Sequence, residues 1–157
     1  SFLITRCVRY DIKGRKYIDT PQKYYFEDLG LRNARIGFRQ VEETHLMENL
    51  IYNELRIRGY LVDVGVVPTR VKDADGAYRR SQLEVEFVCN RGSERVYVQS
   101  AYRLPTEEKR KQEMASLLKI DDSFRKIIIT EDLIKRHMDE NGVEWVNVYD
   151  FLKSEEL

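Results

Sequence analysis

Two short segments of this 157-residue chain carry acidic and amide side chains in the alternating pattern of β-strands. The first segment alternates Glu84 and Glu86 with apolar residues, which are expected to share the opposite face of a sheet: Leu83, Val85, Phe87 and Cys89. The second segment, 96–101, places Gln99 on one face with Tyr97 and Ala101. A hairpin of these strands would set two carboxylates beside a carboxamide.

A third carboxylate, Glu48, lies on the strongest helix that the sequence predicts. Apolar residues recur at helical spacing through residues 41–58, with Gly59 at the stop position, and Glu48 lies at the border of that stripe. Mg²⁺ prefers oxygen ligands and usually binds one or two carboxylates together with waters and phosphates. Glu48, Glu86 and the Gln99 carbonyl are therefore candidate Mg²⁺ ligands, with Glu84 in reserve. The alternative is an ordinary half-exposed strand, with Glu48 and Gln99 holding the helix to the sheet.

The elements around these residues follow from periodicity and turn signals. Strands are expected at 2–8, 17–19, 23–28, 60–67, 83–89, 95–102, 125–130 and 143–149, helices at 41–58, 105–118, 131–138 and 150–157, and a polar loop at 68–81. From residue 41 the order of the principal elements is α-β-β-β-α-β. The expected fold class is α/β (α+β), with a central mixed sheet that helices flank.

This series and its acidic residues resemble the restriction-endonuclease-like core of the PD-(D/E)xK nuclease superfamily. The resemblance implies an acidic residue on one strand and Glu-x-Lys on the next, which hold Mg²⁺ and a water, and often a helix Glu at the place of Glu48. Here the Glu-x-Lys place reads Gln99-Ser100-Ala101. The lysine that would orient the water and offset transition-state charge is absent. We therefore expect Glu48, Glu86 and Gln99 to form a vestigial site.

Basic residues offer candidate contacts to nucleic acid, although a solvated surface is the alternative for each group. Lys+Arg and Asp+Glu are equal at 27, but residues 1–40 hold nine basic and four acidic residues, whereas residues 121–157 hold five and ten. The candidate contacts are Arg32 and Arg35, with Arg39 at similar spacing, and the run Lys109, Arg110 and Lys111 on the predicted 105–118 helix.

Several classes of protein are disfavoured. No apolar run approaches the ~20 residues of a membrane helix. Cys7 and Cys89 have no metal-site spacing, and without a signal peptide they indicate reduced thiols in a cytoplasmic protein. The chain contains no G-x-x-x-x-G-K-[ST] phosphate loop, so no ATP hydrolysis is expected from it. It begins at Ser1 without an initiator Met, as a piece of a longer protein would.

Four stretches together resemble one family: 20–34, 47–55 with 58–60, 83–88 and 97–102. They are similar to the C-terminal, nuclease-like domain of unknown function in a group of prokaryotic AAA-superfamily P-loop ATPases. The resemblance implies that residues 1–40 are the tail of a winged-helix-like connector and residues 41–157 the nuclease-like domain. ATP would then bind only to an ATPase module outside this chain. The family commonly has Asp at the place of Glu86, Gln at the place of Gln99, and Val at the place of Ser100.

Three functions remain open at this stage. The first is an accessory domain of an intracellular ATPase that binds DNA, RNA or a protein partner without cleaving it. The second is a weak or lapsed Mg²⁺-dependent endonuclease. The third is a structural module that mediates homo-oligomerisation or contact with the ATPase module.

Overall fold

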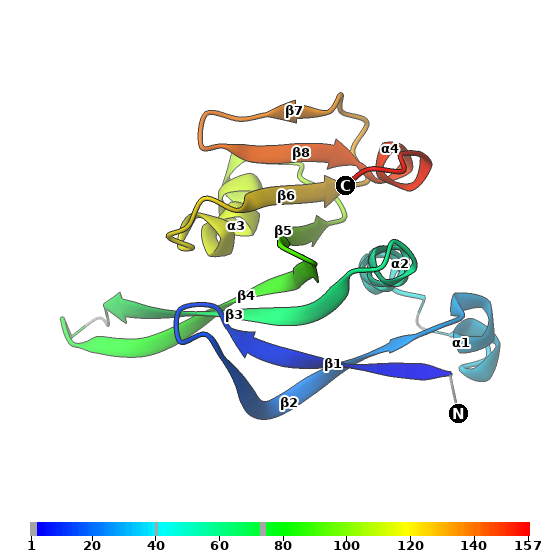
Figure 1. Ribbon diagram of the computed structural model, residues 1–157, viewed down its shortest axis with the longest axis horizontal. Helices are drawn as coiled ribbons and strands as arrows, with labels where there is room; N and C mark the ends of the chain where they lie inside the picture. The colour runs from blue at the N-terminus through cyan, green and yellow to red at the C-terminus, as the bar shows by residue number, and fades with distance from the viewer. Residues whose placement is uncertain (1–2, 40, 73–74) are drawn as a thin grey trace.

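The computed structural model describes residues 3–39, 41–72 and 75–157, whose eight strands form one mixed sheet with helices on both faces (Figure 1). The strand order is β2-β1-β3-β4-β5-β6-β8-β7. The strands are β1 (Ile4–Asp11), β2 (Lys16–Phe26), β3 (Leu61–Lys72), β4 (Tyr78–Arg91), β5 (Glu94–Ala101), β6 (Arg125–Thr130), β7 (His137–Met138) and β8 (Val143–Asn147). The helices are α1 (Leu29–Arg35), α2 (Glu43–Ile57), α3 (Glu107–Leu118) and α4 (Val148–Lys153).

The predicted fold class is confirmed, because the central sheet is mixed and helices flank it. The series α2-β3-β4-β5-α3-β6 has the expected order. β4 and β5 are adjacent and antiparallel, and the crossover helix α3 leads into β6, which pairs with β5 in parallel. Among the described residues, no helix combines the length and apolarity needed to cross a membrane.

Each face of the sheet has its own apolar cluster. On one face, α2 contributes a buried stripe at helical spacing, Met47, Ile51, Tyr52 and Leu55, and α4 adds Val148 and Phe151. On the other face, Met114 and Leu117 of α3 pack on the sheet. α2 ends before Gly59, whose φ of +84° is the left-handed conformation that glycine adopts most readily. The two clusters together bury the sheet from both sides.

A β-bulge in β4 corrects the predicted strand faces. Asp63 pairs with Val88 and Gly65 pairs with Val85, so β4 has one residue more than β3 between these pairs. As a result Val85 packs in the α3-side cluster, whereas Phe87 packs in the α2-side cluster. The expectation of one shared apolar face for Leu83, Val85, Phe87 and Cys89 is therefore wrong.

The predicted loop at 68–81 is also wrong in its larger part. β3 continues to Lys72 and β4 begins at Tyr78, and the two strands pair along this length. Residues 73 and 74 lie outside the described residues. Pro68 is compatible with the strand because β1 pairs with β3 only as far as Val66, so the missing N–H faces no neighbouring strand there.

The predicted helix at 131–138 is not formed. The Asn147 side-chain amide donates to the carbonyl oxygens of Glu131 and Asp132, at 3.3 and 2.8 Å, and the Asp132 carboxylate accepts the Leu104 N–H at 2.9 Å. These contacts hold the segment in an irregular path that ends in the short strand β7.

The N-terminal hairpin belongs to the same sheet as the rest of the chain. β1 pairs with β3 in parallel, and β2 lies outside β1 with a register shift near Pro21 that bends it (Figure 1). Asn49 of α2 clamps the end of β2: its side chain accepts the Phe26 N–H at 2.9 Å and donates to the Phe26 carbonyl at 2.8 Å. The origin of residues 1–40 in a connector stays a prediction.

We predict that Asn49→Ala lowers the free energy of unfolding by about 1–2 kcal/mol, because the partly buried Phe26 N–H loses its acceptor, whereas the Phe26 carbonyl keeps Asn53 as a donor at 2.9 Å. Urea unfolding followed by circular dichroism measures the change. Gln112→Ala, at an exposed position of α3, is the control and is expected to change stability by less than ~0.5 kcal/mol. Equal stability of both variants would contradict the clamp.

Candidate polar site between β2, α2 and β4

The centre of the candidate site is the ammonium group of Lys23, which lies between two carboxylates. Its Nζ is 2.8 Å from Oε1 of Glu48 on α2 and 2.7 Å from Oε1 of Glu84 on β4. Arg9 of β1 approaches the other oxygen of Glu84 at 2.6 Å. The N-terminal hairpin of β1 and β2 is thus joined to α2 and β4 through two carboxylates and two cations.

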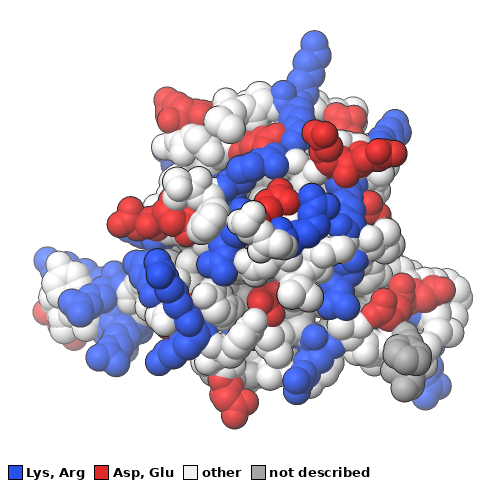
Figure 2. All heavy atoms as spheres, in the orientation of Figure 1, with Lys and Arg blue, Asp and Glu red and all other residues white. Residues whose placement is uncertain are grey.

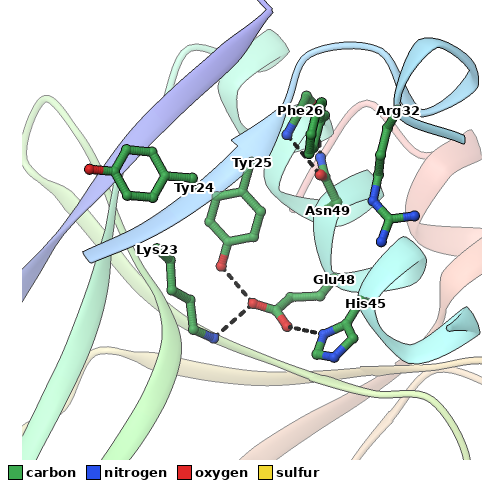
Figure 3. A pocket seen from close by; sticks show the side chains of 8 residues that line it. All are labelled: Lys23, Tyr24, Tyr25, Phe26, Arg32, His45, Glu48 and Asn49. Carbon is green, nitrogen blue, oxygen red and sulfur yellow. Dashed lines mark hydrogen bonds and ion pairs between the residues drawn. The ribbon is translucent and has the colours of Figure 1, made fainter. Parts of the chain in front are cut away.

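Glu48 is held from several directions (Figure 3). It is buried, and its Oε1 accepts the Tyr25 hydroxyl at 2.6 Å in addition to Lys23. Lys23 and Tyr25 reach it together because residues two apart in a strand share a face. The Tyr25 ring stacks on Tyr52 with centroids 4.1 Å apart, so the α2-side core fixes the hydroxyl in place.

The pKa shifts of Lys23 and Glu84 show that the ammonium and the carboxylate stabilise each other's charge. Burial acts to lower the pKa of Lys23, but Glu48 and Glu84 outweigh it and raise that pKa above its ordinary value. Burial acts to raise the pKa of Glu84, and Lys23 and Arg9 outweigh it and lower that pKa. Burial and then the Glu48 carboxylate raise the pKa of Tyr25. The lysine is therefore charged and Glu84 ionised at neutral pH.

A pocket of about 330 Å³ opens beside Lys23 and Glu48. It lies between the end of β2 and the first turns of α1 and α2, and its walls include Tyr24, Arg32 and His45 (Figure 3). Tyr24 is exposed, in contrast to its neighbour Tyr25. The structure thus brings Arg32, predicted as a nucleic-acid contact, to the edge of the polar site.

Glu86 and Gln99 meet where β4 and β5 separate. The backbone pairing of β4 with β5 ends at Phe87 and Val98. Beyond this pair, side chains form the hydrogen bonds between the two strands. Gln99 Oε1 accepts the Glu86 N–H at 3.3 Å, and Glu86 Oε2 accepts the Ser100 N–H at 2.5 Å. Gln99 Nε2 donates to Glu113 of α3 at 3.4 Å. Gln99 therefore faces α3, on the same side of the sheet as Tyr97 and Ala101. The meeting point lies in the middle of the sheet, between β4 and β5.

The Glu86 side chain is partly buried. Burial and then the nearby negative charge of Glu48 raise its pKa well above the ordinary value of 4.5, against the opposing effects of Lys23 and the Ser100 N–H. The influence of Glu48 and Lys23 on Glu86 shows that the three predicted residues, Glu48, Glu86 and Gln99, gather in one region. Their roles in catalysis or binding stay predictions.

The geometry does not suit a Mg²⁺ ion at Glu48 and Glu86. The Lys23 ammonium fills the place between Glu48 and Glu84, and the Glu86 carboxylate accepts the Ser100 N–H. Gln99 Oε1 is engaged by a backbone N–H. Within the described parts of the chain, no group of three or more His, Cys, Asp or Glu side chains is arranged to hold a metal ion.

The predicted basic contacts lie apart from one another. Arg32 and Arg35 belong to α1, near α2, whereas the 109–111 run belongs to α3 on the other face of the sheet (Figure 1). Lys109 pairs with Glu113 at 2.5 Å, and Arg110 lies over the Trp145 ring at 5.2 Å. These residues do not form one continuous basic surface.

The role of Lys23 was not predicted from the sequence. The signal was present in the alternation of Lys23 and Tyr25, which places an ammonium and a hydroxyl on one face of a strand. Their target, Glu48, is 25 residues away from Lys23, so only the packing of β2 against α2 identifies the partner.

Comparison with known proteins gives one relative. A protein of Haemophilus influenzae (strain KW20 Rd), described as uncharacterised, is 32% identical over 152 residues, which are 97% of this chain. The chain spans about a third of that relative, 34% of its length. No family model and no solved structure matches the chain.

We predict that Glu86→Gln makes the protein more stable than the wild type at about pH 8. A carboxyl group whose pKa is raised on folding contributes stability that is fully present below its unfolded pKa and is lost as pH rises through the folded pKa. The glutamine keeps an acceptor for the Ser100 N–H and does not ionise. Urea unfolding between about pH 4.5 and pH 8 should show the gain growing with pH.

The control variant for this measurement is expected to change the stability in the opposite direction. Burial acts to raise the pKa of Glu144, but Arg125 and Arg136, at 2.8 and 2.5 Å, lower it overall. Glu144→Gln should therefore be less stable than the wild type at neutral pH, and the difference should shrink as pH falls through the lowered pKa. A Glu86→Gln protein that loses stability at high pH would refute the assignment of a raised pKa.

We predict that Lys23→Met lowers the free energy of unfolding by roughly 2 kcal/mol, less than for a fully buried pair because the lysine is partly exposed. Its loss leaves Glu48 and Glu84 facing one another without the shared cation. The matched control is Lys16→Met, at an exposed position of the same strand. Chemical unfolding at neutral pH compares the two, and equal stability would show that the bridge contributes nothing.

Proposed function

We propose that this chain is a nuclease-like accessory domain of a larger cytoplasmic protein, which binds nucleic acid without cleaving it. The resemblance described above supplies the rest of the proposal: an ATPase module of the same protein binds ATP and acts on the nucleic acid that this domain holds. The buried, free thiols of Cys7 and Cys89 are in keeping with a reducing compartment.

The observation that carries the proposal is the state of the polar site. The α-β-β-β-α-β order brings Glu48, Glu86 and Gln99 together, which is the placement that the nuclease resemblance implies. Their oxygen atoms are engaged by Lys23, Tyr25 and backbone N–H groups. Ala101, at the place of the nuclease lysine, is buried in the α3-side core. Such a scaffold favours binding over cleavage.

A weak Mg²⁺-dependent endonuclease is the second candidate, and Lys23 favours it. This lysine comes from β2 rather than from β5, yet it places an ammonium group beside the acidic residues, where a nuclease lysine would act. A ligand phosphate that drew Lys23 away from Glu48 would free one carboxylate for a cation.

A structural or homo-oligomerisation module is the third candidate. A shallow groove of about 280 Å³ between α2 and α4 has mainly apolar walls, which include Leu46, Leu50 and Leu152, with Leu50 exposed. An apolar surface of this kind would suit a protein partner.

We predict that the chain binds nucleic acid with an affinity that falls steeply as the salt concentration rises, because each phosphate that is neutralised releases condensed counterions. On duplex DNA the logarithm of the binding constant should fall with the logarithm of the salt concentration, with a slope of about −0.9 per phosphate contact. A fluorescence anisotropy titration at several salt concentrations measures it. The same samples, analysed by size-exclusion chromatography with light scattering, give the oligomeric state. A dimer that binds no nucleic acid would favour the structural module instead.

The same preparation separates binding from cleavage. Plasmid DNA incubated with the chain and Mg²⁺ or Mn²⁺ should remain supercoiled, since loss of even one preorganised charge contact typically costs roughly 10²–10³ in rate. Glu86→Ala controls for contaminating nuclease. Nicking by the wild type that is lost in Glu86→Ala would establish the endonuclease in place of the binding domain.

A further inference from the structure

The β3–β4 arm, residues 68–72 with 78–82, projects from the sheet as a two-stranded ribbon (Figure 1). β1 pairs with β3 no further than Val66, and β5 pairs with β4 from Phe87 onward. The arm therefore has no neighbouring strand on either side among the described residues. At ~3.4 Å per residue, its five paired positions extend about 17 Å.

The arm carries most of its charge as cations on paired strands. Arg70 lies directly opposite Arg80, and Lys72 lies opposite the exposed Tyr78. Directly opposed residues of an antiparallel pair share a face, so these four side chains form one row. Figure 2 shows Lys and Arg side chains gathered over the part of the molecule where the arm projects. Of the two acidic residues in this segment, Asp75 lies in the turn, and Asp73 lies outside the described residues.

Two more cations reach the base of the arm from other elements. Lys13 of the β1–β2 turn and Lys119 at the end of α3 line a hollow of about 880 Å³ together with Arg70 and Arg80. The other walls are neutral residues such as Thr69, Ser81 and Gln82, and no acidic residue that the structure describes lines the hollow. Within the described chain, none of these four cations forms an ion pair with a carboxylate.

This arrangement destabilises the free domain. Like charges directly opposite one another in a sheet repel, and Arg70 and Arg80 have this relation, with Lys13 and Lys119 adding to the same field. By contrast, Lys23, Arg9 and Arg125 are each paired with a carboxylate. A bound polyanion would relieve the repulsion, because phosphate groups accept charge-assisted hydrogen bonds from arginine.

We propose that the β3–β4 arm binds duplex DNA, with the Arg70–Arg80 face against the groove and the phosphates. The inference rests on the proposed function and names its surface and ligand. The major groove of B-DNA is about 12 Å wide and admits a two-stranded β-ribbon. The major groove of A-form RNA is deep and narrow, and single strands are bound mainly by stacking on aromatic side chains, of which the arm offers only Tyr78.

The test compares the whole chain with Arg70→Gln/Arg80→Gln in anisotropy titrations against duplex DNA, single-stranded DNA and duplex RNA. The double variant should bind duplex DNA roughly tenfold or more weakly at low salt, and its salt slope should be shallower by about one unit per residue. Lys135→Gln/Lys153→Gln removes the same charge from exposed positions outside the arm and should bind as the wild type does. Arg70→Lys/Arg80→Lys should keep most of the affinity, because the charges remain.

The outcomes separate this inference from the proposed function. If Arg70→Gln/Arg80→Gln binds duplex DNA as tightly as the wild type does, the arm is not the binding surface, although the domain still binds nucleic acid. A wild type that binds single-stranded DNA or duplex RNA more tightly than duplex DNA would overturn the assigned ligand. A wild type that binds none of the three would refute the proposed function itself. Unchanged circular dichroism spectra of the variants establish that binding and not folding was altered.

Discussion

The bridge from Lys23 to Glu48 and Glu84 is the interaction on which the arrangement of this protein depends. It joins β2 to α2 and to β4, and Arg9 of β1 completes it. Without the ammonium, two carboxylates would face one another in a partly buried space, where charge repulsion is stronger than in water. With it, the N-terminal hairpin is held to both the helix and the centre of the sheet.

The bridge is effective because its surroundings hold it in place. The Tyr25–Tyr52 stack fixes the hydroxyl that also binds Glu48, and Asn49 fixes the end of β2 through Phe26. Polar contacts then continue through the gap between β4 and β5, from Glu86 to Gln99 and on to Glu113 of α3. Side chains thus link the two faces of the sheet at the point where its backbone ladder is interrupted.

The sequence predicted the principal elements because they depend on periodicity alone. The stripe of α2, the buried strand β6 and the pairing of β4 with β5 each follow from local patterns. The bulge in β4 was not predictable, since Val85 and Phe87 preserve a period of two although they face different cores. Pro68 begins the predicted loop at 68–81, yet it lies where β3 has a free edge.

The candidate site was also predicted only in part, because local patterns identify some of its residues but not those whose partners lie far away in the sequence. Glu48, Glu86 and Gln99 were recognised from their spacing and resemblance, and the structure gathers them. Lys23 was not, because its partners come from α2 and β4 and no local pattern connects them. The predicted helix at 131–138 failed through a similar long-range contact, since the Asn147 amide takes the carbonyl oxygens of Glu131 and Asp132.

The polar site and the β3–β4 arm are coupled by their position on one strand. Arg80 and Glu84 are four residues apart in β4, before the bulge, so they share a face and are separated by about 13 Å. A polyanion on the arm would therefore extend toward Glu84. An unpaired carboxylate there would repel it, whereas Lys23 and Arg9 neutralise that charge. The same bridge that closes the acidic residues to a metal ion thus makes this face compatible with bound DNA.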